Sequence, residues 1–351
     1  MNQVSSQVDP LATKLPVTII TGFLGSGKTT LIRRLLTHPD MNRVAVVINE
    51  IGEIGIDNDL VRMSSENVTL LANGCLCCTV RTDLQETLRE LFGQRRAGQI
   101  ADFDRIVVET TGLADPAPVV QTLVSDTMLS AHYRLDGVVT LVDAVNGISN
   151  IETTPEAQKQ IALADRIIIT KSDLVSEAEL ATLRERVAAV NPRADAVAAV
   201  MGEIDPALLT GLGLASARAG ARTLSFLGEG VAQPGSGESY LGARLPARHD
   251  SGIRTLSLRF DKPFSWEAFS AAMDMLTTLR GPDLLRVKGI VNVAGKPVVV
   301  QGVQHIFHPP LHLDQWPSED RDTRMVFISR KLDEAMIRGL FAAVGALLPS
   351  A

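Results

Sequence analysis

One short segment, GFLGSGKT at residues 22–29, constrains the fold of this chain more than any other part of the sequence. It matches the phosphate-loop pattern G-x-x-x-x-G-K-[ST]; the β-branched run VTIITG leads into it, and KTTLIRRLLT, which has helical apolar spacing, follows. A strand, a glycine-rich turn and a helix in this order surround a phosphate with backbone N–H groups and the positive end of a helix dipole. The segment therefore predicts a P-loop nucleotide-binding fold.

The residues of this phosphate loop have distinct expected roles. Lys28 is expected to place its charge on the β- and γ-phosphate oxygens, and the Thr29 hydroxyl to ligate Mg²⁺. Glycines allow backbone N–H groups to approach a phosphate without a clash from Cβ. The residues expected to contact the phosphates are Gly22, Gly25, Ser26, Gly27, Lys28, Thr29 and Thr30.

The sequence Thr170-Lys171-Ser172-Asp173, at the end of the apolar run RIIIT, indicates which base the nucleotide carries. It is similar to the [N/T]-K-x-D motif of G proteins, with Thr170 where asparagine is commoner. An aspartate carboxylate accepts hydrogen bonds from both N1–H and the N2 amine of guanine, and sites built on such bonds discriminate by about 10⁴-fold or more. We expect Thr170, Lys171 and Asp173 to bind guanine. The alternative is a solvated helix start that Asp173 caps.

A carboxylate and a glycine follow the apolar run RIVV, in the sequence ETTG at residues 109–112. In P-loop proteins a carboxylate at this position organises the Mg²⁺ shell or its waters, so Glu109 joins Lys28 and Thr29 as a candidate catalytic residue. The Gly112 N–H is expected to approach the γ-phosphate. The alternative for Glu109 is an ordinary strand-end carboxylate, and Asp143, which ends VVTLVD, is expected to be structural.

Strand-like and helix-like segments alternate from about residue 16 to 205, and the nucleotide-binding domain is expected to span 16–210. This alternation predicts an α/β fold, in which a mostly parallel sheet has helices on both faces. Two expected helices carry end signals. One ends at Gly93 as its C-cap, and the other, over 176–190, begins with Ser176 as its N-cap and Glu179 three residues later.

The rest of the chain divides by composition. Residues 1–15 are polar and are expected to be a disordered tail, and 211–252 are rich in Gly, Ala, Ser and Pro, as linkers are. Over 253–351 the order strand, helix, strands, helix predicts a smaller α+β domain with its helices on one face. Within it, residues 309–322 are expected to be a functional or disordered loop.

The three cysteines of the chain, Cys75, Cys77 and Cys78, fall within four residues. Clustered thiolates bind soft metal ions, and an odd, crowded set does not suit a disulfide framework. Structural zinc closes four ligands, whereas fewer thiolates suit transfer of the ion, with Glu50 and Glu53 as candidates to complete the site. The alternatives are buried, inert cysteines or a redox role, although C-x-C-C lacks the C-x-x-C spacing of redox sites.

A weaker metal candidate is formed by His305, His308 and His312, for which a solvated loop is the alternative.

The net charge is −6, no cluster of positively charged residues is visible in the sequence, and aromatic residues make up only 4%. These features exclude most nucleic-acid binders, which need clustered positive charge or aromatic side chains that stack on bases. No apolar run reaches the roughly 18 residues of a membrane span, and the N-terminus lacks the features of a signal peptide. We therefore expect a cytoplasmic protein that binds neither nucleic acid nor membranes.

These motifs together resemble the CobW-like family of P-loop GTPases, relatives of the urease and hydrogenase nickel-insertion GTPases. The resemblance rests on TGFLGSGKTTLI, NEIGEIGIDND, NGCLCCTVR, ETTGLADPAP, DGVVTLVDA and TKSD, and in the C-terminal half on RVKGIVNV, QGVQHIF and QWPSEDRDTRMVFISRKLDE. It implies a GTPase domain followed by a CobW-type α+β domain. Two departures are that the linker has only His249 where some members carry a histidine-rich stretch, and that Ile48 stands where some relatives use an acidic residue.

The resemblance implies GTP hydrolysis coupled to delivery of a metal ion, most often zinc, to a client metalloprotein. On this hypothesis GTP or GDP and Mg²⁺ bind the phosphate loop, Lys171 and Asp173 hold guanine, and the three cysteines hold Zn²⁺, with Co²⁺ or Ni²⁺ as other candidates. We expect a monomer or a weak homo-oligomer. The alternatives are a GTP-binding metal buffer or scaffold without turnover, and a P-loop kinase for a small molecule.

Overall fold

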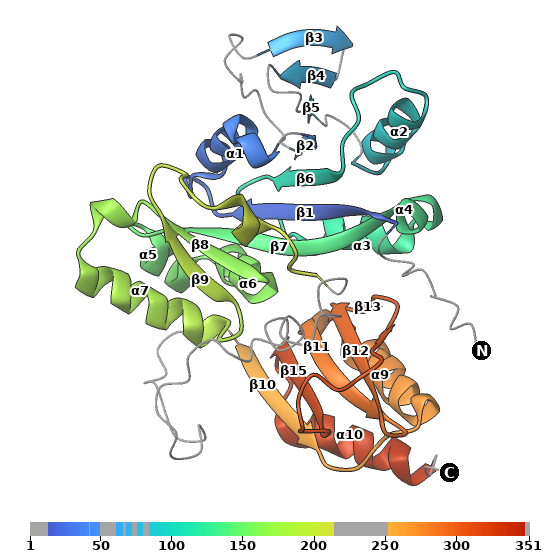
Figure 1. The fold of residues 1–351 in the computed structure, drawn as a ribbon. Helices are drawn as coiled ribbons and strands as arrows, with labels where there is room; N and C mark the ends of the chain where they lie inside the picture. Colours follow the sequence, from blue (N-terminus) through green and yellow to red (C-terminus); the bar gives the residue numbers. More distant parts are fainter. Residues whose placement is uncertain are drawn as a thin grey trace.

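The computed structural model describes residues 13–41, 43–49, 61–65, 68–71, 76–79, 84–213 and 252–347, which form two sheets with their helices (Figure 1). The larger sheet consists of β1 (Leu15–Gly22), β2 (Val44–Asn49), β3 (Val61–Ser65), β4 (Val68–Leu71), β5 (Leu76–Thr79), β6 (Arg105–Thr110), β7 (Tyr133–Asp143), β8 (Arg166–Thr170) and β9 (Asp195–Ala199). Its strand order is β3-β4-β5-β2-β6-β1-β7-β8-β9. Neighbours are parallel from β5 through to β9 in this order, and β3, β4 and β5 form antiparallel pairs.

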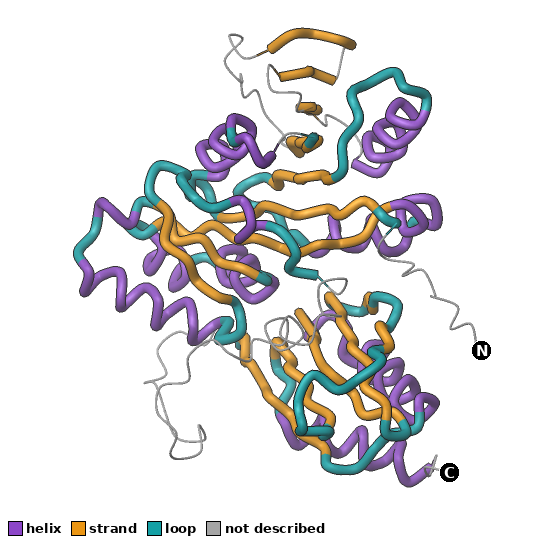
Figure 2. Tube along the Cα trace, in the orientation of Figure 1, coloured by secondary structure: helices purple, strands orange, loops and turns teal. Residues whose placement is uncertain are grey.

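Helices cover both faces of the larger sheet, which confirms the predicted α/β fold (Figure 2). They are α1 (Lys28–Thr37), α2 (Leu84–Arg96), α3 (Ala117–Ser125), α4 (Thr127–His132), α5 (Gly147–Thr153), α6 (Pro155–Leu163) and α7 (Glu177–Val190). Consecutive residues of β1 pack on opposite faces of the sheet. Ile19 belongs to the hydrophobic cluster that contains Leu88 of α2, and Ile20 belongs to the cluster that contains Leu31 of α1. Since side chains alternate across a strand, this burial on both faces explains the near-continuous apolar strands.

The ends of α7 and α2 test the predicted cap signals. Helix α7 begins as predicted: the Ser176 hydroxyl accepts from the Glu179 N–H at 3.3 Å, and the Glu179 carboxylate accepts from the Ser176 N–H at 2.8 Å. The prediction for Gly93 is wrong, because α2 runs through it to Arg96, and the left-handed glycine that follows is Gly98, with φ +67°. A glycine inside a helix costs only about 1 kcal/mol relative to alanine, so a glycine alone does not end a helix.

The smaller sheet is antiparallel, with the order β10-β15-β11-β12-β13 and β14 paired to β12. Both of its helices pack into one core on one face, as predicted for an α+β domain. Most of the expected tail and linker lies outside the described residues, so the domain boundaries stay predictions. The elements are β10 (Ile253–Phe260), α9 (Trp266–Arg280), β11 (Leu284–Val293), β12 (Lys296–Val303), β13 (Ile306–Phe307), β14 (Leu311–His312), β15 (Thr323–Arg330) and α10 (Glu334–Leu347). Short 3-10 helices are η1 (Pro39–Met41), η3 (Ser172–Leu174), η4 (Pro206–Leu209) and η6 (Gly281–Asp283).

The segment 309–322 is a loop that is anchored to the smaller sheet, which contradicts the expectation of disorder, whereas a functional role for it stays a prediction. Its short strand β14 pairs with β12, and Leu311 is buried against Ile290 and Val299. The Trp316 indole N–H donates to the Gly295 carbonyl at 3.0 Å. The pairing of β14, the burial of Leu311 and the Trp316 hydrogen bond therefore anchor this segment.

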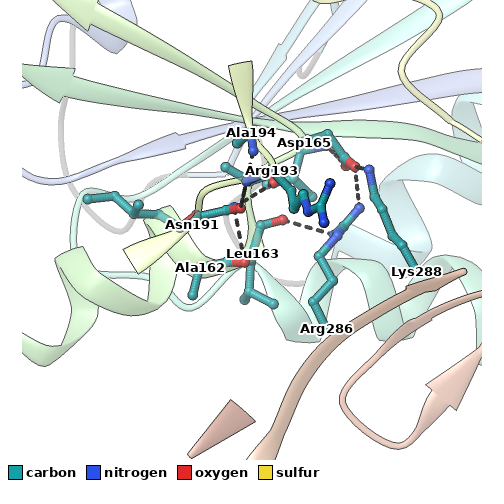
Figure 3. A network of polar contacts seen from close by, with 11 residues as sticks. Ala162, Leu163, Asp165, Asn191, Arg193, Ala194, Arg286 and Lys288 are labelled. Atoms are coloured by element: carbon teal, nitrogen blue, oxygen red, sulfur yellow. Dashed lines mark hydrogen bonds and ion pairs between the residues drawn. The ribbon is translucent and has the colours of Figure 1, made fainter. Parts of the chain in front are cut away.

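The two sheets are joined by a buried polar network between α6 and β11 (Figure 3). Arg286 donates to the Leu163 carbonyl at 2.9 Å and to the Asp165 carboxylate, and Lys288 donates to the same carboxylate at 2.5 Å. Asp165 follows α6 on the larger-sheet side, whereas Arg286 and Lys288 belong to β11.

None of the described helices has the length and apolarity needed to cross a bilayer.

Candidate functional site

The phosphate loop connects β1 to α1 at the carboxyl edge of the sheet, as the sequence predicts. Gly25 and Gly27 have φ values of +75° and +89°, a left-handed conformation that glycine adopts without strain. Gly27 is the N-cap of α1 and supplies no capping side chain, so the first N–H groups of the helix remain available to a ligand. This geometry fits the anion-binding role predicted for Gly25 to Thr29.

Two polar side chains of the phosphate loop are buried. Lys28 is 7% exposed, and its Nζ donates to the Gly22 carbonyl at 2.8 Å. Ser26 is 2% exposed, and its hydroxyl has no hydrogen-bond partner among the described residues. A buried hydroxyl without a partner is costly, and a phosphate oxygen at this loop would supply an acceptor. The residues of the loop therefore fit a bound phosphate chain.

Residues 170–173, which are predicted to bind guanine, lie directly against the phosphate loop. Thr170 Oγ1 donates to the Ser26 carbonyl at 2.8 Å, and a side chain at Gly27 would contact the Thr170 side chain. Asp173 is exposed in the first turn of η3. Asp173 lies inside η3, whose N-cap is Lys171, so the alternative that Asp173 caps a helix start is wrong.

The end of β6 and the residues after it lie beside the phosphate loop, on the opposite side of β1 from β7 and β8. Glu109 is 1% exposed at the end of β6, and the Thr110 hydroxyl donates to that of Thr21 in β1 at 2.8 Å. A Cβ at Gly112 would lie 2.6 Å from the Leu24 side chain, so only glycine fits there. The structure thus brings Glu109 and Gly112 to the same edge as the phosphate loop.

Sequence reasoning missed Gln160 of α6, which holds the segment after Gly112. Its Nε2 donates to the Gly112 carbonyl at 3.2 Å and to the Ala114 carbonyl at 3.0 Å, and the side chain is 1% exposed. Lys159, the preceding residue, forms an ion pair with Asp115. No motif marks either residue, because their partners lie more than forty positions earlier in the chain.

The predicted metal residues fall mainly in the undescribed part of the chain. Glu50, Glu53 and Cys75 lie outside the described residues, and Cys77 and Cys78 lie in strand β5 rather than in the expected loop. Strand β5 is parallel to β2, and its Thr79 pairs with Ile48, which in turn pairs with Glu109 of β6. The cysteine motif, whose last residue is Cys78, therefore ends in the sheet one residue before the level of Glu109 in β6.

The three histidines do not form a metal site. Among the described residues no group of three or more His, Cys, Asp and Glu side chains is arranged to hold a metal ion. His308 is half-buried with its Nε2 enclosed and without a hydrogen-bond partner, whereas His312 lies 6.4 Å from the Trp266 ring. Burial, and next the Arg286 cation, lowers the pKa of His308 from 6.5 to about 4.

We expect the His308 environment to make the free energy of unfolding depend on pH. His308 stays neutral in the folded chain down to about pH 4, whereas in the unfolded chain it binds a proton below about 6.5. Its contribution is therefore present above pH 6.5 and falls as the pH is lowered, by about 1–2 kcal/mol between pH 7 and 5. Urea unfolding of wild type and His308→Leu at both pH values measures it; an equal pH dependence of the two proteins would contradict this assignment.

Two protein-family models match the sequence. The first describes the CobW/HypB/UreG nucleotide-binding domain and matches residues 16–198. The second describes the cobalamin synthesis protein cobW C-terminal domain and matches residues 253–345. The two matches cover the larger and the smaller sheet, respectively.

Individual proteins match over long stretches. The zinc chaperone YjiA of Escherichia coli is 36% identical over 333 residues, which is 94% of this chain and 98% of that protein. Zinc-regulated GTPase metalloprotein activator 1 of Schizosaccharomyces pombe is 38% identical over 211 residues, which is 57% of this chain and 48% of that protein. The crystal structure of Zn(II)-bound YjiA GTPase from E. coli has a TM-score of 0.70 at 34% identity, and the match covers 94% of this chain and 99% of that one.

Proposed function

Because this chain belongs to the CobW/HypB/UreG family, we propose that it is a GTP-hydrolysing metallochaperone. It binds a transition-metal ion at its C-x-C-C motif and transfers the ion to a client metalloprotein. Zinc is the proposed ion, since the similar proteins are named a zinc chaperone and a zinc-regulated GTPase metalloprotein activator. Thiolate and carboxylate ligands suit Zn²⁺ and also admit Co²⁺ or Ni²⁺.

The hydrogen bond from Thr170 Oγ1 to the Ser26 carbonyl, at 2.8 Å, is the observation that carries the nucleotide part of the proposal. It holds the guanine motif against the phosphate loop, so that one nucleotide can reach both. The phosphates then lie at the left-handed glycines and the N-terminus of α1. The exposed Asp173 carboxylate is free to accept from the guanine N1–H and N2 amine.

Hydrolysis depends on groups that stabilise charge on the phosphate oxygens. Lys28 contributes its buried ammonium, and Gly112 its N–H, which Gln160 orders by binding the Gly112 carbonyl. Thr29 and Glu109 are the proposed holders of Mg²⁺, which when bound neutralises phosphate charge. Turnover without a client is expected to be slow, as in GTPases that lack their activator.

The metal part of the proposal uses Cys75, Cys77 and Cys78, with Glu50 and Glu53 as further ligands. The register from β5 through β2 to β6 supports it, because Thr79, the residue after Cys78, is level in the sheet with Glu109, a proposed Mg²⁺ residue. A γ-phosphate that orders the neighbouring residues 49–60 would thereby change the ligand set of the metal. Hydrolysis could then release the ion to a client.

We expect zinc to bind with an affinity that depends on the nucleotide. A coupled site should show about a 5- to 150-fold difference in zinc affinity between a non-hydrolysable GTP analogue and GDP. Linkage requires zinc to change the relative affinities of the two nucleotides by the same factor. Competition with a zinc-binding dye measures the first factor, and calorimetry with each nucleotide measures the second.

The control for this measurement is Cys77→Ser, which should lose zinc affinity while it keeps GDP affinity. Equal zinc affinities with both nucleotides in the wild type would remove the coupling. A single-turnover assay for phosphate release, with no added acceptor, separates the proposal from a metal buffer without turnover and from a kinase, both of which would release no phosphate.

A further inference from the structure

Asp143 ends strand β7 beside the guanine motif, and three donors hold its carboxylate. They are the Val145 N–H at 2.8 Å, Asn146 Nδ2 at 3.0 Å and Lys171 Nζ at 2.7 Å. The Asp143 side chain is 3% exposed. Burial raises the pKa of Asp143, but the hydrogen bonds from Lys171 and Asn146 outweigh it and hold the pKa below its ordinary value. The carboxylate is therefore ionised and rigidly held at neutral pH.

Lys171 is fixed at both of its ends. Its backbone has φ +55°, an uncommon conformation for a residue other than glycine, and its carbonyl accepts from the Leu174 N–H at 3.0 Å. Its ammonium is held by Asp143, which is the register partner of Thr170 in the pairing of β7 with β8. A free lysine side chain has large rotamer entropy, so this ion pair orders Lys171 before a ligand arrives.

We propose that Asp143 is a positioning residue for recognition of the guanosine part of the nucleotide. It does not touch the nucleotide; it holds the Lys171 side chain in the place where that side chain meets the base. The inference rests on the proposed GTP binding and adds a specificity-determining role for Asp143, for which the sequence predicts only a structural one. Pre-ordering a contact group raises affinity because less conformational entropy is lost on binding.

This role predicts which kinetic constant changes. Lys171 and Asp143 lie at the base end of the site, whereas hydrolysis takes place at the phosphate loop. An interaction with the base is the same in the ground state and the transition state, so its loss raises KM for GTP and leaves kcat unchanged. A general loosening of the fold would instead lower kcat as well.

Strand β7 offers a matched control at its opposite end. Asp136 is 1% exposed and pairs with Arg105 at 3.0 Å and Arg134 at 3.2 Å. It is therefore a buried, ion-paired aspartate on the same strand, and among the described residues its polar partners lie outside segment 170–173. Asp136→Asn should lower the free energy of unfolding and leave the affinity for GDP unchanged.

The test is a double-mutant cycle on GDP affinity, measured by calorimetry on the full chain. Asp143→Asn and Lys171→Met should each weaken GDP binding by about tenfold, and the double variant should be no weaker than either single one. KM for GTP should rise with kcat retained in both. If Asp143→Asn does not fold, Asn146→Ala, which removes one donor from an exposed position, should weaken GDP binding by about threefold.

Two outcomes overturn the proposal while GTP binding itself stands. One is unchanged GDP affinity in Asp143→Asn or, where that variant does not fold, in Asn146→Ala. The other is strict additivity of the Asp143 and Lys171 changes, which would mean that the two residues act separately. If instead wild type binds GDP no better than ADP, the proposed function fails, and the cycle has nothing to measure.

Discussion

Replacement of Lys28 by alanine is expected to lower kcat/KM for GTP hydrolysis by about 10²–10³-fold. Lys28 is 7% exposed and lies within the phosphate loop, where its ammonium donates to the Gly22 carbonyl at 2.8 Å. At such a site of low dielectric constant, a positive charge interacts with phosphate oxygens far more strongly than in water. Rates of phosphate release at several GTP concentrations give kcat and KM separately.

Two further variants sharpen the Lys28 experiment. Lys28→Arg should not restore the rate, because the planar guanidinium is larger than the ammonium and does not fit the enclosed position beside the Gly22 carbonyl. Lys14→Ala is the matched control: Lys14 precedes the same strand and donates to the Ser130 carbonyl at 2.6 Å, at the opposite end of β1. A Lys28→Ala protein with a rate within threefold of wild type would contradict the role of the phosphate loop.

The parts of the site that the sequence predicts are those carried by local motifs. The phosphate loop needs only that glycines at fixed spacing separate a strand from a helix, and the left-handed Gly25 and Gly27 meet that requirement. The apolar runs predict parallel strands such as β7 and β8 because this signal is also local: each run spans only the five to eleven residues of its strand. The sheet order then places Glu109 and Thr170 beside the loop, because carboxyl ends of parallel strands share one edge.

The parts that the sequence could not predict depend on partners far apart in the chain. Gln160 binds the Gly112 carbonyl across 48 positions, and Arg286 binds Asp165 across 121. A local feature can also lack a sequence signal: between β12 and β13, Gln304 adopts φ +53°, which its residue type does not suggest. The sequence predicts that His308 is solvated or binds metal, whereas its Nε2 is enclosed, and no local pattern marks this burial.

Removal of the charge of Asp165 is expected to destabilise the contact between the two sheets by about 3–5 kcal/mol. Asp165 and Arg286 are 2% and 3% exposed, and Lys288 is 14% exposed (Figure 3). Burial raises the pKa of Asp165, but the Arg286 and Lys288 cations outweigh it and hold the pKa below the ordinary 3.8. In Asp165→Asn the two cations lose that counter-charge while they stay buried, which is the costly case.

Urea unfolding of the full chain measures this cost. Both tryptophans, Trp266 and Trp316, belong to the smaller-sheet part, so their fluorescence reports its unfolding, whereas circular dichroism reports both sheets. The fluorescence midpoint of Asp165→Asn should fall. Asp102→Asn is the control, because Asp102 is 60% exposed in its pair with Arg43, and exposed pairs contribute about 0–1 kcal/mol.

A combined variant separates unpaired charge from lost packing as the cause. The triple replacement Asp165→Leu, Arg286→Met and Lys288→Met removes the whole cluster, and apolar replacements of similar volume are often neutral or stabilising. It should therefore recover most of the stability that Asp165→Asn loses. If the triple variant were less stable than Asp165→Asn, the cluster would act through its hydrogen bonds to the Leu163 carbonyl and the Val138 N–H rather than through charge balance.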